Sequence, residues 1–364
     1  MSLNHPVRVL LLQDSATNNN WGGVQTMTQT LQLALQEQGF EVTALPWQQT
    51  KFGELLYEAR HSDILVASHN FGPTYCGVAL KTLTHKPLVS WVHGPLIEVL
   101  QMSKASLWKR RWLKHVYGYV DQFVCVSQTT ESSLLGFLSG FRAQTNDNIN
   151  RGNSSTTSSG KTPHTVVIPN GLTPLTGNAD SFVSDVHTAA STNLSLGYIG
   201  RLSQEKRPHL LLETLRALPD DAHLSVVGDG VLRPELEDAG KDLMANGRLN
   251  FLGRQVSNQN LYTPYQVTLL TSNYEGCPMT ALESLACGVP CLALPIPAMR
   301  ELFAEDAPYL LAHDETPQAL AIAVLNLMRM PKEQVQKDIA RITSKHSPPK
   351  FGLSWRIAIQ SSIN

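Results

Sequence analysis

Short apolar runs that alternate with helix-length segments constrain the fold of this chain most strongly. Five runs of strand length lie in its first part, at residues 7–12, 41–46, 63–68, 87–92 and 122–127. A second series follows at residues 194–200, 223–230, 249–253, 267–272 and 289–295. Strands that are apolar on both faces are typical of parallel sheets covered by helices on both sides. The sequence therefore predicts an α/β protein with two doubly wound parallel sheets.

Two polar stretches divide the chain. Residues 143–164 are rich in Ser, Thr, Asn and Gly, which predicts a surface insertion, and residues 172–193 read as a linker. We therefore expect a first domain over residues 1–171, a second over 194–347 and a C-terminal segment over 348–364. Ligands of open α/β sheets bind beyond the carboxyl ends of the strands, so two facing sheets predict a site in the cleft between them.

Charge, cysteine spacing and the short first apolar run argue against nucleic acid, zinc and a membrane span. The 364 residues carry 29 basic and 30 acidic side chains, so no broad basic field is available to hold nucleic acid. The five cysteines form no CxxC pair, and Cys287 and Cys291 have no neighbouring histidine, which favours apolar thiols over a zinc site. The apolar run at residues 7–12 is too short for a signal peptide or for a membrane span of about 20 residues, so we expect a soluble, cytoplasmic chain.

The segment SNYEGCPMTALESLACGVPCLALP, residues 272–295, contains one short helix between a proline and a glycine. Pro278 suits a helix start and Gly288 a helix stop, so we expect a helix over residues 279–287. Backbone N–H groups at Met279 and Thr280 would make the helix start an anion site. The expected apolar stripe of this helix is Met279, Leu282 and Ala286.

Two glutamates lie eight residues apart in this segment. Glu275 lies on the loop after a buried strand, and Glu283 lies at the edge of the apolar stripe of the helix. Eight residues of helix span roughly 12 Å, which is longer than the ~5 Å or ~6.5–9.5 Å that separate a glycosidase acid/base pair. The spacing favours separate roles for the two carboxylates.

Further polar residues and glycines follow other strands. Arg201 and Lys206 lie five residues apart at the exit of the strand at 194–200, where two cations suit an anion, although alone they would read as solvated loop charges. Gly22 and Gly23 separate the first strand from its helix, as in a phosphate-binding turn or a plain tight turn. His93 follows the strand at 87–92, where its side chain would face the expected cleft.

The order of these motifs resembles the retaining glycosyltransferases of family 4, which have the GT-B fold of two facing Rossmann-like domains. The motifs are GRLSQEK, VVGDG, FLG, EGCPMTALE and ACGVP, and the resemblance covers residues 194–312. The spacing from Glu275 to Glu283 matches the paired-glutamate motif of that family. The N-terminal half matches more loosely, through GGVQTMTQTL, WVHG and VIPNG. The family often has a bulky apolar residue where this chain has Cys277.

The resemblance implies a donor diphosphate held by Arg201 and Lys206, with the N–H groups near Met279 and Thr280 sharing it. No carboxylate cluster of DxD type stands at a strand end, so these fixed cations and the helix dipole, rather than a divalent metal, would stabilise the leaving group.

The resemblance also implies roles for both glutamates and for the histidine. Glu283 would accept hydrogen bonds from the ribose hydroxyls, while Glu275 and His93 would contact the transferred sugar. The first domain would bind the acceptor and the second the nucleotide sugar. The final helix would cross back onto the first domain, with an apolar face of Leu353, Trp355 and Ile357.

The implied activity is retaining transfer of a hexose from a nucleotide diphosphate sugar, with UDP favoured, to a hydroxyl of a glycan or glycolipid. Lipopolysaccharide core or another cell-envelope polysaccharide is the acceptor that the resemblance favours. A nicotinamide oxidoreductase would need GxGxxG after the first strand, which DSATNNNWGG lacks. A sugar-nucleotide epimerase or hydrolase of the same fold, and a non-catalytic sugar-nucleotide binding protein, remain open.

The segment SLWKRRWLKHVYGYV, residues 106–120, is an amphipathic helix with a basic side. One expected face carries Trp108, Trp112, Val116 and Tyr119, and the opposite face carries Arg110, Arg111, Lys114 and His115. The aromatic face could pack on the sheet while the basic face meets water. The basic face could also contact anionic lipid or a phosphorylated glycolipid at the inner face of a membrane.

Overall fold

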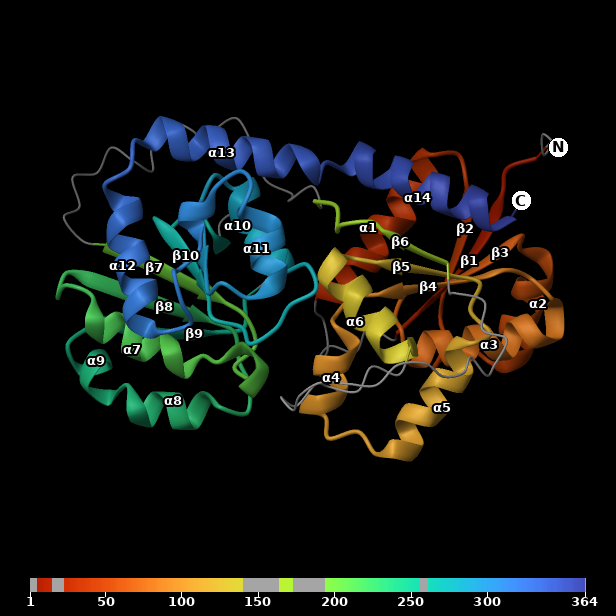
Figure 1. The fold of residues 1–364 in the computed structure, drawn as a ribbon, viewed down its shortest axis with the longest axis horizontal. Helices are drawn as coiled ribbons and strands as arrows, with labels where there is room; N and C mark the ends of the chain where they lie inside the picture. Colours follow the sequence, from red (N-terminus) through yellow and green to blue (C-terminus); the bar gives the residue numbers. More distant parts are fainter. Residues whose placement is uncertain (1–4, 15–22, 140–163, 173–193, 256–260, 364) are drawn as a thin grey trace, which may run out of the picture. The chain divides into compact units, whose positions relative to one another are not determined.

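The computed structural model describes residues 5–14, 23–139, 164–172, 194–255 and 261–363 (Figure 1). Gly22 lies outside the described residues. The polar insertion and the linker that the sequence predicts also lie outside them, apart from their end residues 164 and 172. The described chain divides into two compact units. One contains Met1–Thr28, Leu35–Ile168 and Ser354–Asn364, and the other contains Gln29–Ala34 and Pro169–Leu353.

The first unit is built on a six-stranded parallel sheet in the order β2-β1-β3-β4-β5-β6. Its strands are β1 Arg8–Gln13, β2 Glu41–Pro46, β3 Ile64–Ala67, β4 Leu88–Val92, β5 Gln122–Cys125 and β6 His164–Val167. The helices between them are α1 Gly23–Glu37, α2 Phe52–His61, α3 Gly72–Thr84, α4 Leu96–Met102, α5 Leu107–Tyr117 and α6 Gln128–Ser139.

The second unit is built on a five-stranded parallel sheet in the order β11-β10-β7-β8-β9. Its strands are β7 Leu194–Ile199, β8 Ala222–Val227, β9 Leu249–Gly253, β10 Val267–Leu270 and β11 Cys291–Ala293. Its helices are η2 Gln204–Lys206, α7 His209–Ala217, α8 Arg233–Ala239, α9 Lys241–Ala245, α10 Met279–Ala286, α11 Pro297–Phe303, η4 Pro308–Leu310, α12 Pro317–Met328 and α13 Lys332–Lys345. The last helix of the chain, α14, runs over Pro348–Ile363.

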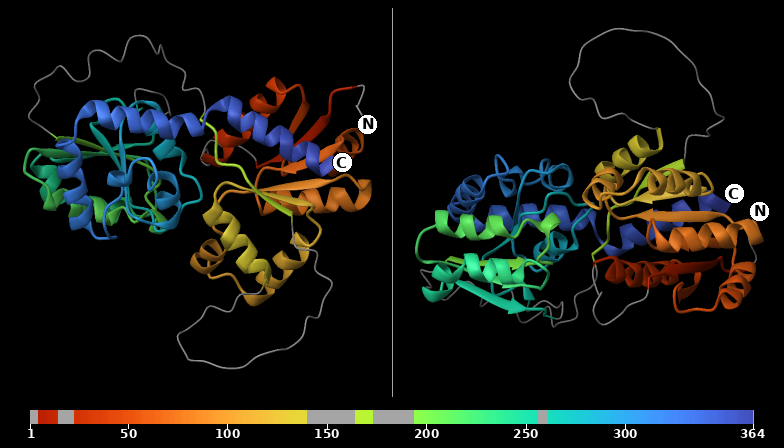
Figure 2. Two further views of the ribbon diagram at one scale, coloured as in Figure 1. Left: turned by 45° about the horizontal axis from the view of Figure 1, so that its top comes forward. Right: turned by 90° about the horizontal axis from the view of Figure 1, so that it is seen from below.

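Helices cover both faces of each sheet, as Figures 1 and 2 show. The apolar runs form strands because a strand in such a sheet buries the side chains on both of its faces. Every residue of β3, β4 and β10 is buried, so no position in them can be polar without a partner. The edge strand β2 is only partly covered and tolerates Glu41 at an exposed position. Each run expected as a strand overlaps one, and the predicted pair of doubly wound parallel sheets is confirmed.

Helix α10 confirms the predicted helix start and stop but corrects its apolar stripe. The helix begins at Met279 after Pro278 and ends at Ala286, and Gly288 has a φ of +73°, which an L side chain rarely adopts. Ala286 is exposed, whereas Ala281, Leu282 and Leu285 are buried with Met279. The stripe turned out broader than expected because the helix packs on both β10 and β11 as well as on α13.

In helix α5 only Val116 of the face expected to pack on the sheet is buried, and the three aromatic residues of that face are not. The side chains that pack inward are Leu113, Val116 and Tyr117, while Trp108 and Trp112 are 81% and 60% exposed. Tyr119, just after the helix, is exposed too. The helix buries this face because Leu113 and Tyr117, four residues apart, form one apolar contact surface. The basic residues beside the two indoles are costly to bury, so Trp108 and Trp112 stay at the surface with them.

The C-terminal helix also packs with a different face from the one expected. Trp355 is fully buried as predicted, but Leu353 and Ile357 are 50% and 60% exposed. The other buried residues of α14 are Phe351, Ala358 and Ile359, which share one side of the helix with Trp355 at a spacing of three to four residues. The helix starts at Pro348 because a proline is well tolerated in a first turn but ends the preceding helix.

Candidate functional site

A topological switch point in the second sheet brings together two loops that carry candidate residues. Strands β8 and β9 lie on one side of β7, and β10 and β11 lie on the other. The chain therefore leaves β7 and β10, which are neighbours, toward opposite sides of the sheet. A crevice at the carboxyl ends of such strands is the usual ligand site of open α/β sheets. The loop after β7 carries Arg201 and Lys206, and the loop after β10 carries Glu275.

Hydrogen bonds join these two loops directly. The backbone N–H of Asn273 donates to the carbonyl of Glu205 at 2.7 Å. The hydroxyl of Thr271 donates to the carbonyl of Lys206 at 2.8 Å. Because both bonds flank Lys206, the position of its side chain is tied to the loop after β10.

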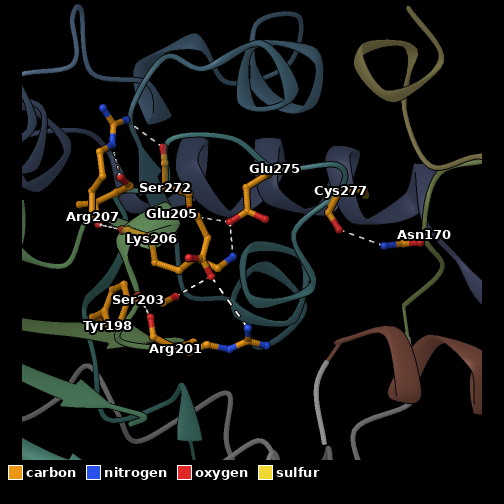
Figure 3. Close-up of polar contacts among 11 residues, drawn as sticks. Asn170, Tyr198, Arg201, Ser203, Glu205, Lys206, Arg207, Ser272, Glu275 and Cys277 are labelled. Carbon is orange, nitrogen blue, oxygen red and sulfur yellow. Dashed lines mark hydrogen bonds and ion pairs between the residues drawn. The ribbon is translucent and has the colours of Figure 1, made fainter. Parts of the chain in front are cut away.

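Arg207, which the sequence did not single out, completes this connection (Figure 3). Its guanidinium donates to the carbonyls of Thr271 and Ser272 at 3.0 and 2.9 Å and to Glu315 at 2.7 Å. Its φ of +46° lies in the left-handed region, which costs an arginine conformational energy that these bonds must offset. The one feature of the sequence that indicates an unusual backbone at Arg207 is the proline that follows it, because a residue before proline is disfavoured in the ordinary helical conformation.

Lys206 and Glu275 form an ion pair at the centre of this arrangement. The Nζ of Lys206 lies 2.5 Å from Oε1 of Glu275, and the hydroxyl of Ser272 donates to the same oxygen at 2.5 Å (Figure 3). The side chains are only 29% and 11% exposed, so each charge depends on the other. The sequence placed these residues in one site, but it did not predict that they pair with each other.

Arg201 is the most accessible cation of the site. Its side chain is 70% exposed and its Nη1 lies 3.9 Å from Oε1 of Glu205, which also accepts a bond from Ser203 at 2.5 Å. The hydroxyl of Tyr198 donates to the Arg201 carbonyl at 3.0 Å and holds the backbone. An exposed guanidinium on a fixed backbone is suited to meet an incoming anion.

Two glycines in the loop after β8 allow close packing of the loop after β7. A Cβ on Gly228, which has a φ of +132°, would lie 1.9 Å from the Gly200 carbonyl oxygen. A Cβ on Gly230 would lie 2.2 Å from the carbonyl oxygen of Leu202. The two glycines of the motif VVGDG therefore leave room for the backbone carbonyls of the residues before and after Arg201.

Helix α10 places the second glutamate. Met279 is buried and Thr280 is half-buried in its first turn, where helix N–H groups lack intrahelical partners. Glu283 is 8% exposed and accepts a hydrogen bond from the hydroxyl of Tyr262 at 2.5 Å. Glu275 and Glu283 thus have different partners. Tyr262 is a residue that the sequence analysis missed, because it follows no motif.

The loop before α10 is held by Asn170. Its side-chain amide donates to the carbonyl of Cys277 at 2.9 Å (Figure 3), and its own carbonyl accepts a bond from the His346 ring at 2.8 Å. Burial raises the pKa of the half-buried Cys277 thiol to about 12, so this residue is a neutral thiol at physiological pH. The motif VIPNG therefore contributes a buried side chain that supports the loop between Glu275 and α10.

His93 belongs to the first unit, at the carboxyl end of β4. Its Nε2 lies 2.8 Å from the Ser68 carbonyl, and its ring packs against Trp91 with centroids 4.3 Å apart. Burial and, to a smaller extent, the neighbouring His69 lower the pKa of His93 to about 3, so the ring is neutral. With Nε2–H donated to Ser68, Nδ1 is the acceptor of the ring.

The other candidate of the first unit is Gly23, which is the first residue of α1. The neighbouring His69 was not singled out by the sequence. It stacks on His93 with centroids 6.2 Å apart, and its Nδ1 lies 4.0 Å from the carboxylate of Asp14, after β1. Among the described residues, no group of three or more His, Cys, Asp or Glu side chains could hold a metal ion.

Comparison with known proteins finds glycosyltransferase families that match two separate segments of the chain. Residues 182–343 match the family "Glycosyl transferases group 1", and residues 44–139 match "Glycosyltransferase Family 4". Anabaena HepE in complex with UDP and glucose has a similar structure, with a TM-score of 0.73 and 16% identity over 98% of this chain and all of that one. The apo galactosyltransferase WaaB gives a TM-score of 0.63 at 15% identity over 98% of this chain and 99% of that one.

Sequence relatives match shorter segments. A GDP-mannose-dependent phosphatidylinositol dimannoside mannosyltransferase of Mycobacterium tuberculosis is 32% identical over 149 residues, which are 40% of this chain and 38% of that protein. The lipopolysaccharide 1,6-galactosyltransferase of Escherichia coli is 34% identical over 102 residues, which are 26% of this chain and 28% of that protein. The matched part thus spans well under half the length of these relatives. Together, the two family matches and the structural similarity support a GT-B glycosyltransferase of the family 4-like group.

Proposed function

We propose that this protein is a retaining glycosyltransferase that moves a hexose from a UDP-sugar to a hydroxyl of a glycan or glycolipid. The observation that carries the proposal is the partly buried pair of Lys206 and Glu275 at the switch point of the second sheet. In this proposal residues 194–347 bind the nucleotide sugar and residues 1–171 the acceptor. The UDP complexes of HepE support UDP as the nucleotide.

The reaction breaks the bond between the anomeric carbon and the diphosphate oxygen and forms a bond to the acceptor oxygen. The acceptor hydroxyl loses its proton, which passes to the departing diphosphate. Negative charge develops on the departing diphosphate. We assign its stabilisation to Arg201, Lys206 and the first N–H groups of α10, near Met279 and Thr280, with Gly22 and Gly23 contributing N–H groups from the first unit.

The ion pair supplies a mechanism for coupling donor binding to sugar recognition. A diphosphate has more negative charge than one carboxylate and would draw Lys206 away from Glu275. The Glu275 carboxylate would then accept hydrogen bonds from the hydroxyls of the transferred sugar, while Ser272 keeps it oriented. His93 would accept a sugar hydroxyl through Nδ1, and Glu283 would bind the ribose.

A product assay tests the function. Purified protein is incubated with UDP-glucose or UDP-galactose, with and without envelope-glycan acceptors such as truncated lipopolysaccharide core. Glycosylated acceptor with the α-linkage of the donor would support retaining transfer. Release of free sugar, or epimerised donor, at the same rate without acceptor would indicate a hydrolase or an epimerase. Binding of UDP-sugar without any product would indicate a binding protein.

Metal independence is a further part of the proposal. Because fixed cations and a helix N-terminus meet the leaving-group charge, we expect transfer in excess EDTA to proceed at the rate seen without chelator. Initial rates with and without added magnesium or manganese measure this. Loss of transfer in EDTA that either metal restores would contradict the expectation.

The acceptor is proposed to be lipid-linked, because α5 exposes an apolar and basic surface. Leu107, Trp108 and Trp112 are exposed on it beside Lys109, Arg111, Lys114 and His115. Arg110, expected on the basic face, instead donates to the carbonyls of Ala105 and Leu100. Exposed indoles between cations fit the boundary of an anionic bilayer. From these exposed indoles and cations of α5, we propose that the enzyme works peripherally at the inner membrane face. No described helix is long and apolar enough to span a membrane.

Replacing both Trp108 and Trp112 by serine is expected to lower partitioning into phosphatidylglycerol vesicles by about tenfold or more, because membrane binding scales with buried apolar area. Vesicle sedimentation measures the bound fraction. The Tyr57→Ser variant is the control, since Tyr57 is a 59% exposed aromatic residue on α2. Equal sedimentation of wild type and double variant would refute membrane contact through α5.

A further inference from the structure

Tyr262 and Glu283 form a buried pair, and the proposed reaction gives a role only to Glu283. The Tyr262 hydroxyl donates to Oε2 of Glu283 at 2.5 Å, and the two residues are 1% and 8% exposed. A carboxylate is rarely buried to this degree unless it is held by polar partners. The pair links α10 to residues 21 positions earlier in the chain, so it exists only in the folded protein.

The surroundings of Tyr262 place the pair at the ligand edge of the sheet. Tyr262 packs in a small buried cluster with Val227, Leu261 and Val289, and Ile199 packs against it. Val227 and Ile199 are the last residues of β8 and β7. The carboxyl ends of strands are where open α/β sheets bind ligands, so the cluster fixes the phenol beside the nucleotide region.

Tyr262 can act only as a hydrogen-bond donor toward Glu283. Burial, reinforced by the adjacent carboxylate, raises the pKa of Tyr262 far above its usual range, so the hydroxyl keeps its proton. A carboxylate accepts about four hydrogen bonds, so the bond from Tyr262 leaves capacity for other donors. A carboxylate already held in one rotamer also loses less side-chain entropy when a ligand binds.

We propose that Tyr262 is a positioning residue that orients the Glu283 carboxylate toward the vicinal ribose hydroxyls of the donor, and so makes the site select ribonucleotides. This inference rests on the proposed function, in which Glu283 binds the ribose. Tyr262 itself would not contact the nucleotide. It acts by holding an acceptor where two neighbouring hydroxyls can both donate to it.

Calorimetric titration of the full chain with UDP and with 2′,3′-dideoxyuridine 5′-diphosphate tests the inference. The measured quantity is the dissociation constant of the dideoxy compound divided by that of UDP. This ratio isolates the contribution of the two ribose hydroxyls to binding. The wild type is expected to prefer UDP, and Tyr262→Phe is expected to reduce this preference about tenfold, as for loss of a hydrogen bond to a charged group. A merely structural defect would weaken both ligands equally and leave the ratio unchanged.

The control variant is Tyr309→Phe, which removes a hydrogen bond of 3.0 Å between a tyrosine and Asp338 elsewhere in the same unit. It should leave the ratio as in the wild type. Glu283→Gln should lower the ratio, and combining it with Tyr262→Phe should lower it no further, because the two residues act through one contact.

Two outcomes separate the inference from the proposed function. UDP binding with an unchanged ratio in Tyr262→Phe would overturn the inference alone. Failure of UDP to bind the wild-type chain would overturn the proposed function together with the inference. If Tyr262→Phe does not fold, Tyr262→Leu, which also removes the hydroxyl and needs less space, takes its place, and an unchanged ratio would overturn the positioning role.

Discussion

Replacing Lys206 by methionine is expected to reduce the rate of transfer from UDP-sugar by at least about 100-fold, the usual cost of deleting one group that stabilises a developing oxyanion. The substitution removes the cation that we propose binds the diphosphate, and it leaves the Glu275 carboxylate, 11% exposed, without its ion partner. UDP affinity should fall as well, because the diphosphate is present in the product. Steady-state kinetics and calorimetry with UDP measure the two effects.

Glu275→Gln distinguishes the roles of the pair. We expect it to abolish most transfer while UDP affinity stays within a few-fold of the wild type. The amide removes the charge that we propose faces the sugar, but it leaves Lys206 for its proposed contact with the phosphates. The control is Lys241→Met, which removes an ion pair with Asp238 whose side chains are both more than 70% exposed. Wild-type turnover in Lys206→Met would show that the site is assigned wrongly.

Replacing Trp355 by alanine is expected to lower the free energy of unfolding by about 3–5 kcal/mol, the cost of deleting a large buried aromatic side chain. Trp355 is fully buried, and its ring meets Trp91 edge-on with centroids 5.0 Å apart. Trp91 in turn packs against His93. The variant should therefore lose transfer activity together with stability.

Urea denaturation followed by tryptophan fluorescence and circular dichroism measures the loss of stability. Leu353→Ala is the matched control on the same helix, because its side chain is 50% exposed and should change stability by no more than about 0.5 kcal/mol. An unchanged urea midpoint for Trp355→Ala would mean that the end of α14 contributes nothing to the fold of the first unit.

The faces of amphipathic helices were the least predictable part of the fold. In α5 the sequence places Trp108 and Trp112 on one side and Leu113 and Tyr117 on another, and both sides contain apolar groups. The spacing of apolar residues predicts that such a helix has a buried face. Which of two apolar faces packs depends on the shape of the sheet surface beneath the helix. The same reason explains the exposure of Leu353 and Ile357 in α14.

The sequence alone determined the strands, because runs such as β3 and β4 are apolar on both faces and can only be satisfied inside a covered parallel sheet. It also determined the ends of α10, since Pro278 and Gly288 act through their own backbone conformations. Tertiary structure alone decided that Lys206 meets Glu275, 69 residues away, and that Tyr262 meets Glu283. Such pairs depend on the order of strands in the sheet, which brings β10 beside β7, and no local pattern of residues encodes that order.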